Sequence, residues 1–232
     1  MKKTTVLLCD DHTIVREGLR FLLEAADDIQ VVGEAENGHR ALGETKRLQP
    51  DVVLMDIAMP LLNGVETTRR IAREVPAAKV LMLSTYSDAQ HVQQSVEAGA
   101  AGYLMKETAS KDLFRAIRET CKGNDFFSPP IGRRLLKRWR NRDPQSKSPA
   151  APALTSRQTE VLQLIAEGYS GKQIARTLYL SIKTVEKHRQ ALMDKLDIHE
   201  IATLTRYAVS SGVVESKPCA QLAGHAHCYA HR

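Results

Sequence analysis

The sequence contains no apolar run long enough to span a bilayer, and only four of its 232 residues are cysteines. The first apolar run, Val6–Cys9, ends at Asp10, whereas a secretory signal needs roughly 7–15 apolar residues. The cysteines form no CxxC pair and no dense framework, which is typical of a reducing compartment. We therefore expect a cytoplasmic protein with no secretory signal and no membrane partner.

Charge is distributed unevenly along the chain, although the net charge is only +6. Residues 1–121 contain 15 Lys and Arg against 18 Asp and Glu, a net charge of −3. Residues 122–232 contain 18 against 9, a net charge of +9. A basic half suits a polyanionic partner, most commonly nucleic acid, although a solvated basic surface has the same composition.

Residues 1–121 alternate short apolar runs with stretches of helical spacing, such as Val15, Leu19 and Leu22. Five buried strands alternating with five helices predict an α/β domain with a doubly wound, five-stranded parallel sheet covered on both faces. The five apolar runs are Thr5–Cys9, Gln30–Glu34, Val52–Met55, Val80–Leu83 and Gly102–Met105.

The composition changes after residue 121 and predicts three further segments. Residues 122–153 combine a basic stretch with Pro-, Ser- and Ala-rich sequence, so we expect a linker with an amphipathic helix at Arg133–Arg142. Residues 154–211 have helical spacing and predict an all-α domain. Residues 212–232 lack periodicity, and their Cys and His residues match no zinc-site spacing, so we expect a flexible tail.

Polar residues follow four of the five predicted strands. Asp10-Asp11 follow the first strand, Asp56 the third, Ser84-Thr85 the fourth and Lys106 the fifth. Because the carboxyl ends of the strands line the ligand crevice of a doubly wound sheet, we expect these side chains to meet. Any one of them could simply cap a strand or helix, but their coincidence at one edge indicates a site.

This set of side chains suits phosphoryl transfer to a carboxylate. Clustered carboxylates repel one another unless a cation joins them, and Mg²⁺ both prefers oxygen ligands and neutralises an incoming phosphoryl group. Asp56 follows the expected middle strand and is therefore the expected nucleophile, which would become an aspartyl phosphate. Lys106 would offset the added charge, and Ser84 would donate a hydrogen bond to a phosphoryl oxygen.

The motifs around these residues resemble the receiver domain of bacterial two-component response regulators, which has a flavodoxin-like fold. The resemblance covers residues 4–121 and implies that a partner histidine kinase phosphorylates Asp56. Thr85 departs from the family pattern, which usually has a small residue there, and it could crowd the phosphoryl group. The matching segments are Leu8–His12, Asp51–Pro60, Asn63-Gly64, Leu83–Thr85 and Gly102–Lys106.

The same resemblance implies roles for individual residues. Mg²⁺ would be held by Asp11, Asp56 and the backbone carbonyl of Ala58, with Asp10 acting largely through water. The switch residues, which respond to the phosphoryl group, would be Ser84, Tyr103 and Lys106.

Capping residues mark three helix starts in residues 154–211. The segments Thr155–Gln158 and Ser170–Gln173 both have capping-box spacing, and Ser181 is placed to cap a third helix. A short turn at Tyr179-Leu180 joins the second and third helices, which predicts a helix-turn-helix.

The third predicted helix has an inward face and a polar face. Val185, His188 and Leu192 share the inward face, which favours a structural role for His188. A recognition helix reads bases with its N-terminal residues, although a solvated helix face would show the same pattern. Arg189, at the edge, is expected to pair with DNA phosphate or with Glu160. The candidates for the DNA groove are Lys183, Thr184, Lys187 and Gln190.

This pattern is similar to the LuxR-type helix-turn-helix, and the whole chain resembles the NarL/FixJ class of response regulators. The resemblance implies four helices, of which the last, at about Ile198–Ser210, serves dimerisation. It also implies that phosphorylation controls sequence-specific binding to double-stranded DNA and transcription, with a homodimer as the phosphorylated form. The matching segments are Leu154–Leu162, Ile165–Gly168, Gln173–Ala175, Leu180-Ser181, Thr184–Arg189 and Lys195-Leu196.

Two other functions remain open from the sequence. A phosphohydrolase that forms an aspartyl phosphate would place a second Asp two residues after the nucleophile, where this chain has Ala58. We therefore expect no turnover enzyme. A phospho-independent adaptor that binds proteins or RNA is the remaining alternative, and a sequence-selective, salt-dependent interaction with duplex DNA would exclude it.

Overall fold

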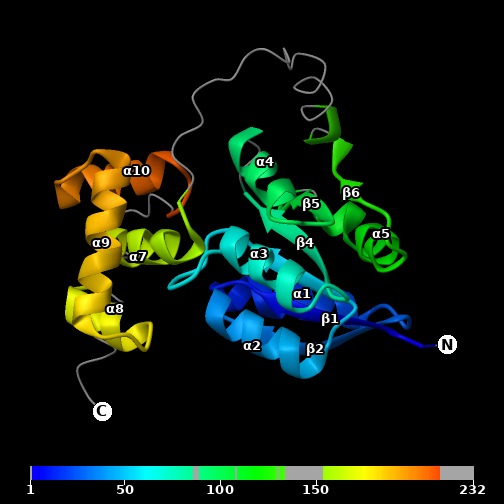
Figure 1. The fold of residues 1–232 in the computed structure, drawn as a ribbon. Coiled ribbons are helices and arrows are strands. Elements are labelled where there is room, and N and C mark those ends of the chain that lie inside the picture. The colour runs from blue at the N-terminus through cyan, green and yellow to red at the C-terminus, as the bar shows by residue number, and fades with distance from the viewer. Residues whose placement is uncertain (1, 86–88, 108, 130, 134–153, 215–232) are drawn as a thin grey trace.

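The structure is a computed structural model, and it shows an α/β domain followed by an all-α domain (Figure 1). The all-α domain lies beside one edge of the α/β domain, and α7 is the helix that lies between them. The residues that the structure describes are 2–85, 89–107, 109–129, 131–133 and 154–214.

The α/β domain is built on a parallel sheet with the strand order β2-β1-β3-β4-β5-β6. β3 lies between β1 and β4, which places it in the middle of the sheet as predicted. The described residues contain six strands, one more than the sequence predicts. They are β1 (Thr4–Cys9), β2 (Ile29–Ala35), β3 (Val52–Asp56), β4 (Lys79–Ser84), β5 (Gly102–Met105) and β6 (Phe126–Phe127).

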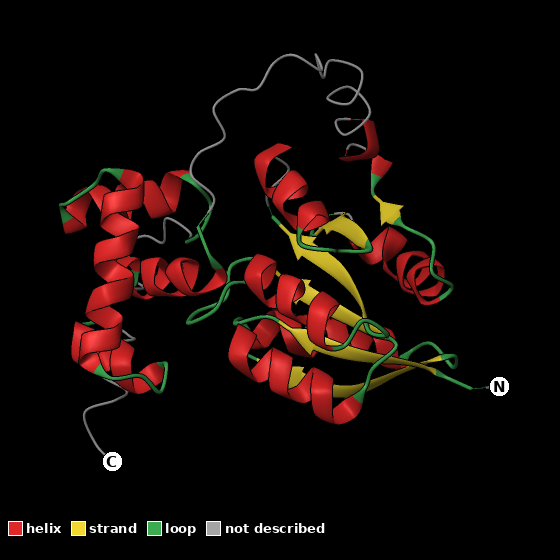
Figure 2. Ribbon diagram, viewed as in Figure 1, coloured by secondary structure: helices red, strands yellow, loops and turns green. Residues whose placement is uncertain are grey.

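Helices cover both faces of this sheet (Figure 2). On one face, α1 and α5 bury Leu23 and Ile117 against strand residues such as Leu54. On the other face, α2, α3 and α4 bury residues such as Ile71 against strand residues such as Val53. Because successive strand residues point to opposite faces, continuous apolar strands supply both cores. The helices are α1 (Thr13–Glu24), α2 (Gly38–Leu48), α3 (Gly64–Glu74), α4 (Ala89–Glu97) and α5 (Ala109–Cys121).

The sixth strand extends the sheet past residue 121, the expected end of the first domain. β6 pairs with β5 in parallel, and Ile131 is fully buried in the core beside it. The prediction missed this strand because two residues are too short to show a period of their own. Part of the segment expected to be a linker therefore packs on the α/β domain.

The second domain contains four helices around one apolar core. They are α7 (Ser156–Ala166), α8 (Gly171–Thr177), α9 (Ile182–Leu196) and α10 (Ile201–Ser210). The capping boxes at Thr155 and Ser170 and the cap at Ser181 are confirmed. Leu162, Leu192 and other apolar side chains of the helices form the core.

Two predictions fall on parts of the chain that the structure does not cover. Most of the helix predicted at Arg133–Arg142 and all the Cys and His residues of the predicted tail lie outside the described residues. In the part that is described, no helix has the length and apolarity needed to cross a membrane.

Candidate functional site

Asp56 is the last residue of β3, and the neighbouring strands place charged and polar residues beside it at the carboxyl end of the sheet. β1 and β3 pair in parallel, so Asp10 leaves β1 beside Asp56. Ser84 ends β4, and Lys106 follows β5 and donates its backbone N–H to the Ser84 carbonyl at 2.8 Å. Parallel pairing thus gathers the carboxyl ends of four strands at one edge, as the sequence predicts.

Three carboxylates and one ammonium form an acidic cluster at this edge: Asp10, Asp11, Asp56 and Lys106. Lys106 Nζ lies 2.7 Å from Asp10 Oδ2 and 3.0 Å from Asp56 Oδ1. One carboxylate oxygen from each Asp and a ring nitrogen of His12 lie within 4.8 Å of one another. Since one ammonium cannot balance three carboxylates, this oxygen-rich donor set fits a divalent cation.

Burial raises the pKa of Asp56 from its ordinary value of 3.8 to about 6. Lys106 opposes the increase, whereas the negative charges of Asp10 and Asp11 add to it. Burial also disfavours the charged form of Lys106, but the carboxylates of Asp56 and Asp10 outweigh this effect and raise its pKa. The ionised form of Asp56 is therefore costly in the folded chain, and a bound cation would reduce that cost.

Asp56→Asn should stabilise the cation-free protein near pH 8, because it removes a buried charge. Because the pKa of Asp56 is raised on folding, the wild type has its full free energy of unfolding below the unfolded pKa of 3.8. It loses part of that free energy as the pH rises through about 6. The substitution should therefore add about 2–3 kcal/mol at about pH 8 and roughly half of that at about pH 5. Urea denaturation in a chelator measures both values, and an equal gain at the two pH values would contradict the raised pKa.

Two basic residues that the sequence prediction did not include also belong to this site. His12 Nδ1 lies 2.8 Å from Asp11 Oδ1 and 3.2 Å from Asp10 Oδ1. Arg16 donates to the backbone carbonyl of Asp10 at 2.7 Å and pairs with Glu34 at 3.2 Å. Arg16 thus holds the turn after β1, and its place in the first turns of the helix that follows the paired aspartates was the signal available in the sequence.

The other predicted residues of the first domain surround the cluster. Ser84 is buried at the end of β4, and Tyr103 is fully buried in the core on the side of α2, α3 and α4. Ala58 is half-buried in the loop after Asp56, and Thr85 is exposed. The switch role of Ser84 and Tyr103 stays a prediction.

The β3–α3 loop, residues 57–63, starts directly after Asp56 and returns to it, because the next residue, Gly64, lies against the Asp56 carbonyl. Gly64 begins α3, and a Cβ there would lie 1.9 Å from the Asp56 carbonyl oxygen, so only glycine fits. Within the loop, Leu61 has a φ of 67°, in the left-handed region, which costs a non-glycine residue about 1–2 kcal/mol. The Leu61 side chain packs against the core of the second domain, so that domain helps to hold the strained backbone.

Glu160 of α7 is fully buried where the two domains meet. Its Oε2 pairs with Arg157 at 2.7 Å, and its Oε1 lies 2.7 Å from Arg70 of α3. No described donor forms a hydrogen bond to Oε1, so Arg70 acts there by charge. His39 lies 3.9 Å from the same oxygen, and burial lowers the pKa of its imidazole. Of the two partners predicted for Arg189, Glu160 is wrong, because Arg157 and Arg70 occupy its carboxylate.

The predicted groove residues of α9 lie on an accessible part of the helix. Lys183, Lys187 and Gln190 are exposed, whereas Thr184 and Arg189 are half-buried. The Thr184 N–H donates to the Ser181 side chain at 3.1 Å, so Thr184 also belongs to the helix cap. The face that carries the two lysines is therefore open to a partner.

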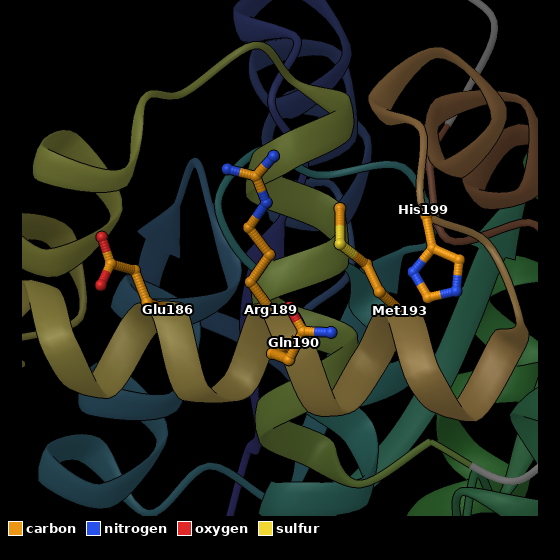
Figure 3. A pocket seen from close by; sticks show the side chains of 5 residues that line it. All are labelled: Glu186, Arg189, Gln190, Met193 and His199. Atoms are coloured by element: carbon orange, nitrogen blue, oxygen red, sulfur yellow. The ribbon is translucent and has the colours of Figure 1, made fainter.

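Further along α9, a shallow hollow lies between this helix and the start of the segment that leads to α10 (Figure 3). Arg189 and Gln190 project from neighbouring positions of α9, and Met193 stands between Arg189 and His199. Gln190 donates to Asp194 at 2.7 Å. The hollow carries mixed charge and adds no ligand chemistry of its own. Its lining residues are Glu186, Arg189, Gln190, Met193 and His199.

The C-terminal end of α10 contacts α4 of the first domain. Gln90 and Gln94 donate to the carbonyl of Ser211 at 3.3 Å and 3.2 Å. Ile201 and Val209 of α10 remain exposed, at 50% and 39%. Helix α10, which is expected to serve dimerisation, thus exposes apolar side chains, and the residue after its end is hydrogen-bonded to the first domain.

Two protein families match the chain in the order of its domains. The response regulator receiver domain matches residues 6–118, and the luxR family of bacterial regulatory proteins matches residues 152–208. The chain belongs to the response regulators with a LuxR-type DNA-binding domain. The predicted fold class and the predicted function of this response regulator are confirmed.

Individual relatives match both the receiver and the DNA-binding domain. Response regulator protein VraR of Staphylococcus aureus is 36% identical over 210 residues, which are 90% of this chain and 98% of that protein. The solved RcsB response regulator of Salmonella typhimurium is 28% identical with a TM-score of 0.61, over 91% of this chain and 99% of that one. ChrA, from a heme-sensing two-component system, is 33% identical with a TM-score of 0.51, over 92% and 100%.

Proposed function

We propose that Asp56 accepts a phosphoryl group from a histidine kinase and that this modification controls sequence-specific DNA binding. The cluster of Asp10, Asp11 and Lys106 around Asp56 is the observation that carries the proposal. An Asp56 carboxylate oxygen forms the bond to phosphorus as the bond from phosphorus to the kinase imidazole nitrogen breaks. Lys106 Nζ, 3.0 Å from Asp56, offsets the added charge, and the Ser84 hydroxyl donates to a phosphoryl oxygen.

Asp11, Asp56 and the carbonyl of Ala58 would hold Mg²⁺, with Asp10 acting through water. The excess of carboxylate over ammonium in the cluster supports this assignment. When bound, Mg²⁺ supplies positive charge that neutralises the phosphoryl oxygens. We propose a stoichiometric phosphoacceptor and no turnover enzyme, because Ala58 stands where a phosphohydrolase would need its acid or base.

We place duplex DNA against the exposed face of α9 that carries Lys183 and Lys187. The related RcsB has been solved as a complex with DNA, 28% identical to this chain with a TM-score of 0.58, over 90% of this chain and 99% of that one. The receiver contacts α7 and the end of α10 and leaves these lysines exposed. We therefore infer that phosphorylation acts by freeing α10 for homodimerisation, and that the protein works in the cytoplasm, where the chromosome lies.

A random pool of duplex DNA, selected with and without a small phosphoryl donor and Mg²⁺, tests this function. Phosphorylated wild type should enrich one sequence and bind it with strong salt dependence. Lys187→Ala should weaken that binding by about tenfold and reduce the salt slope by about one, because it removes one cation from the groove face. Gel shifts at several salt concentrations measure both.

Lys3→Ala is the matched control, since Lys3 is an exposed lysine of the receiver. It should bind the selected DNA as wild type does. Enrichment of no sequence would favour the alternative of a phospho-independent adaptor that binds proteins or RNA. Multiple turnovers of a small phosphate ester would favour the phosphohydrolase.

A further inference from the structure

Helix α7 of the DNA-binding domain holds the backbone of the β3–α3 loop at several points. Gln163 Nε2 donates to the Met59 carbonyl at 2.9 Å, and Gln163 Oε1 accepts from the Asn63 N–H at 2.8 Å. The Leu61 N–H donates to the Glu167 carboxylate at 3.2 Å. Three alternate residues of a seven-residue loop are thus hydrogen-bonded to α7 and its C-cap residue Glu167.

These contacts determine the orientation of the Gln163 side-chain amide. It is 1% exposed, and its amide nitrogen donates to Met59 and to Glu167 Oε1 while its oxygen accepts from Asn63. Rotating the amide by half a turn would set donor against donor and acceptor against acceptor. The network therefore holds one loop conformation, and weakening it leaves buried polar groups without partners.

The loop that α7 holds is the segment closest to the phosphoacceptor. It starts at the residue after Asp56, contains Ala58, and ends where Gly64 lies against the Asp56 carbonyl. Leu61 is in a strained left-handed conformation and packs its side chain into the core of the DNA-binding domain. A strained residue whose backbone N–H and side chain are both held by the other domain can relax when those contacts are withdrawn.

We propose that Gln163, Glu167 and Leu61 form an interdomain clamp through which the DNA-binding domain lowers the affinity of the Asp56 site for Mg²⁺ and slows its phosphorylation. This inference rests on the proposed function, in which phosphorylation loosens the contact between the domains. By linkage, whatever loosens the clamp when it binds must bind less well while the clamp is closed. The clamp thus couples Mg²⁺ binding and phosphorylation at Asp56 to the contact between the two domains.

The clamp predicts a gain of function in variants of the full chain. Gln163→Ala and Glu167→Ala should each lower the Mg²⁺ dissociation constant, measured by titration calorimetry, by about five- to tenfold. They should also speed phosphorylation by phosphoramidate by a similar factor. Glu167→Gln keeps an oxygen for the Leu61 N–H and should behave nearly as wild type. Gln30→Ala and Glu200→Ala, at exposed positions, are matched controls.

Amide hydrogen exchange supplies a readout that is independent of phosphorylation. In wild type the Leu61 and Asn63 amides should be protected, and Gln163→Ala should remove that protection while the strands of the sheet keep theirs. Mg²⁺ with beryllofluoride, a phosphoryl mimic, should lower the same protection in wild type. If Gln163→Ala fails to fold, Glu167→Ala, at a half-buried position, carries the same comparison.

The outcomes separate the clamp from the function on which it rests. Wild type that binds no Mg²⁺ and takes no label would overturn the proposed function and the clamp together. Wild type that does both, with variants whose Mg²⁺ affinity and labelling rate equal its own, would overturn the clamp alone. Leu61 protection that does not respond to Mg²⁺ and beryllofluoride would also overturn the clamp.

Discussion

Asp56→Ala is expected to abolish covalent labelling by a small phosphoryl donor in Mg²⁺, lowering incorporation by at least about a hundredfold. The carboxylate of Asp56 lies at the end of the central strand, within 3.0 Å of the Lys106 ammonium that offsets the added charge. Asp10 and Asp11 follow a different strand, β1, so neither carboxylate occupies the position of Asp56 at the end of β3. Mass spectrometry of the intact chain measures the label, which should be stable in acid and labile in base.

Asp27→Ala is the matched control for this loss, because Asp27 is an exposed aspartate away from the cluster. It should label as wild type does. Circular dichroism of Asp56→Ala should show a folded receiver, since the substitution removes a buried charge and leaves apolar neighbours in place. Label on Asp56→Ala equal to that on wild type would contradict the assignment of the phosphoacceptor.

Glu160→Ala is expected to lower the free energy of unfolding by about 3 kcal/mol, which is a large share of the stability of a domain. The substitution removes a fully buried carboxylate that two arginines share. It leaves Arg157 with only the Leu178 carbonyl and Arg70 with only the longer ion pair to Glu66, at 3.5 Å. Arg157 lies in the same helix, whereas Arg70 belongs to the receiver, so the change should weaken both the DNA-binding domain and its contact with the receiver. Urea denaturation followed by circular dichroism measures the loss.

Variants of the two arginines separate these effects. Arg157→Ala should destabilise the DNA-binding domain, whereas Arg70→Ala should mainly separate the domains, which small-angle scattering detects as a larger radius of gyration. Glu17→Ala, at an exposed position of α1, should change neither quantity. A free energy of unfolding of Glu160→Ala within about 0.5 kcal/mol of the wild-type value would show that water solvates the two arginines in the variant and that the ion pairs contribute little.

The acidic cluster at Asp56 could be predicted almost completely from the sequence. Strand residues are contiguous in the chain, and parallel strands end at one edge, so a polar residue directly after an apolar run is placed by local pattern alone. Asp10, Asp56, Ser84 and Lys106 were found in this way. His12 was missed although it follows the paired aspartates, because an exposed histidine shows no pattern that separates a site from a surface.

The contact between the domains was decided only by the tertiary structure. In the sequence, Gln163 and Glu167 look like ordinary polar residues in and beside an amphipathic helix, and their partners in the loop lie 100 or more positions away. Periodicity reports which face of a helix is apolar, but it carries no information on which loop a buried polar side chain will meet. The same limit explains why Glu160 was assigned to Arg189 and not to Arg70.

By itself, therefore, the sequence determined the two folds, the order of the domains and the acidic cluster at Asp56. These features follow from the spacing of neighbouring residues. The tertiary structure alone decided that α7 holds the loop after Asp56 and that the receiver leaves the lysine face of α9 uncovered. These features depend on how the surfaces of two folded domains pack together, and the short-range spacing of residues contains no information on that packing.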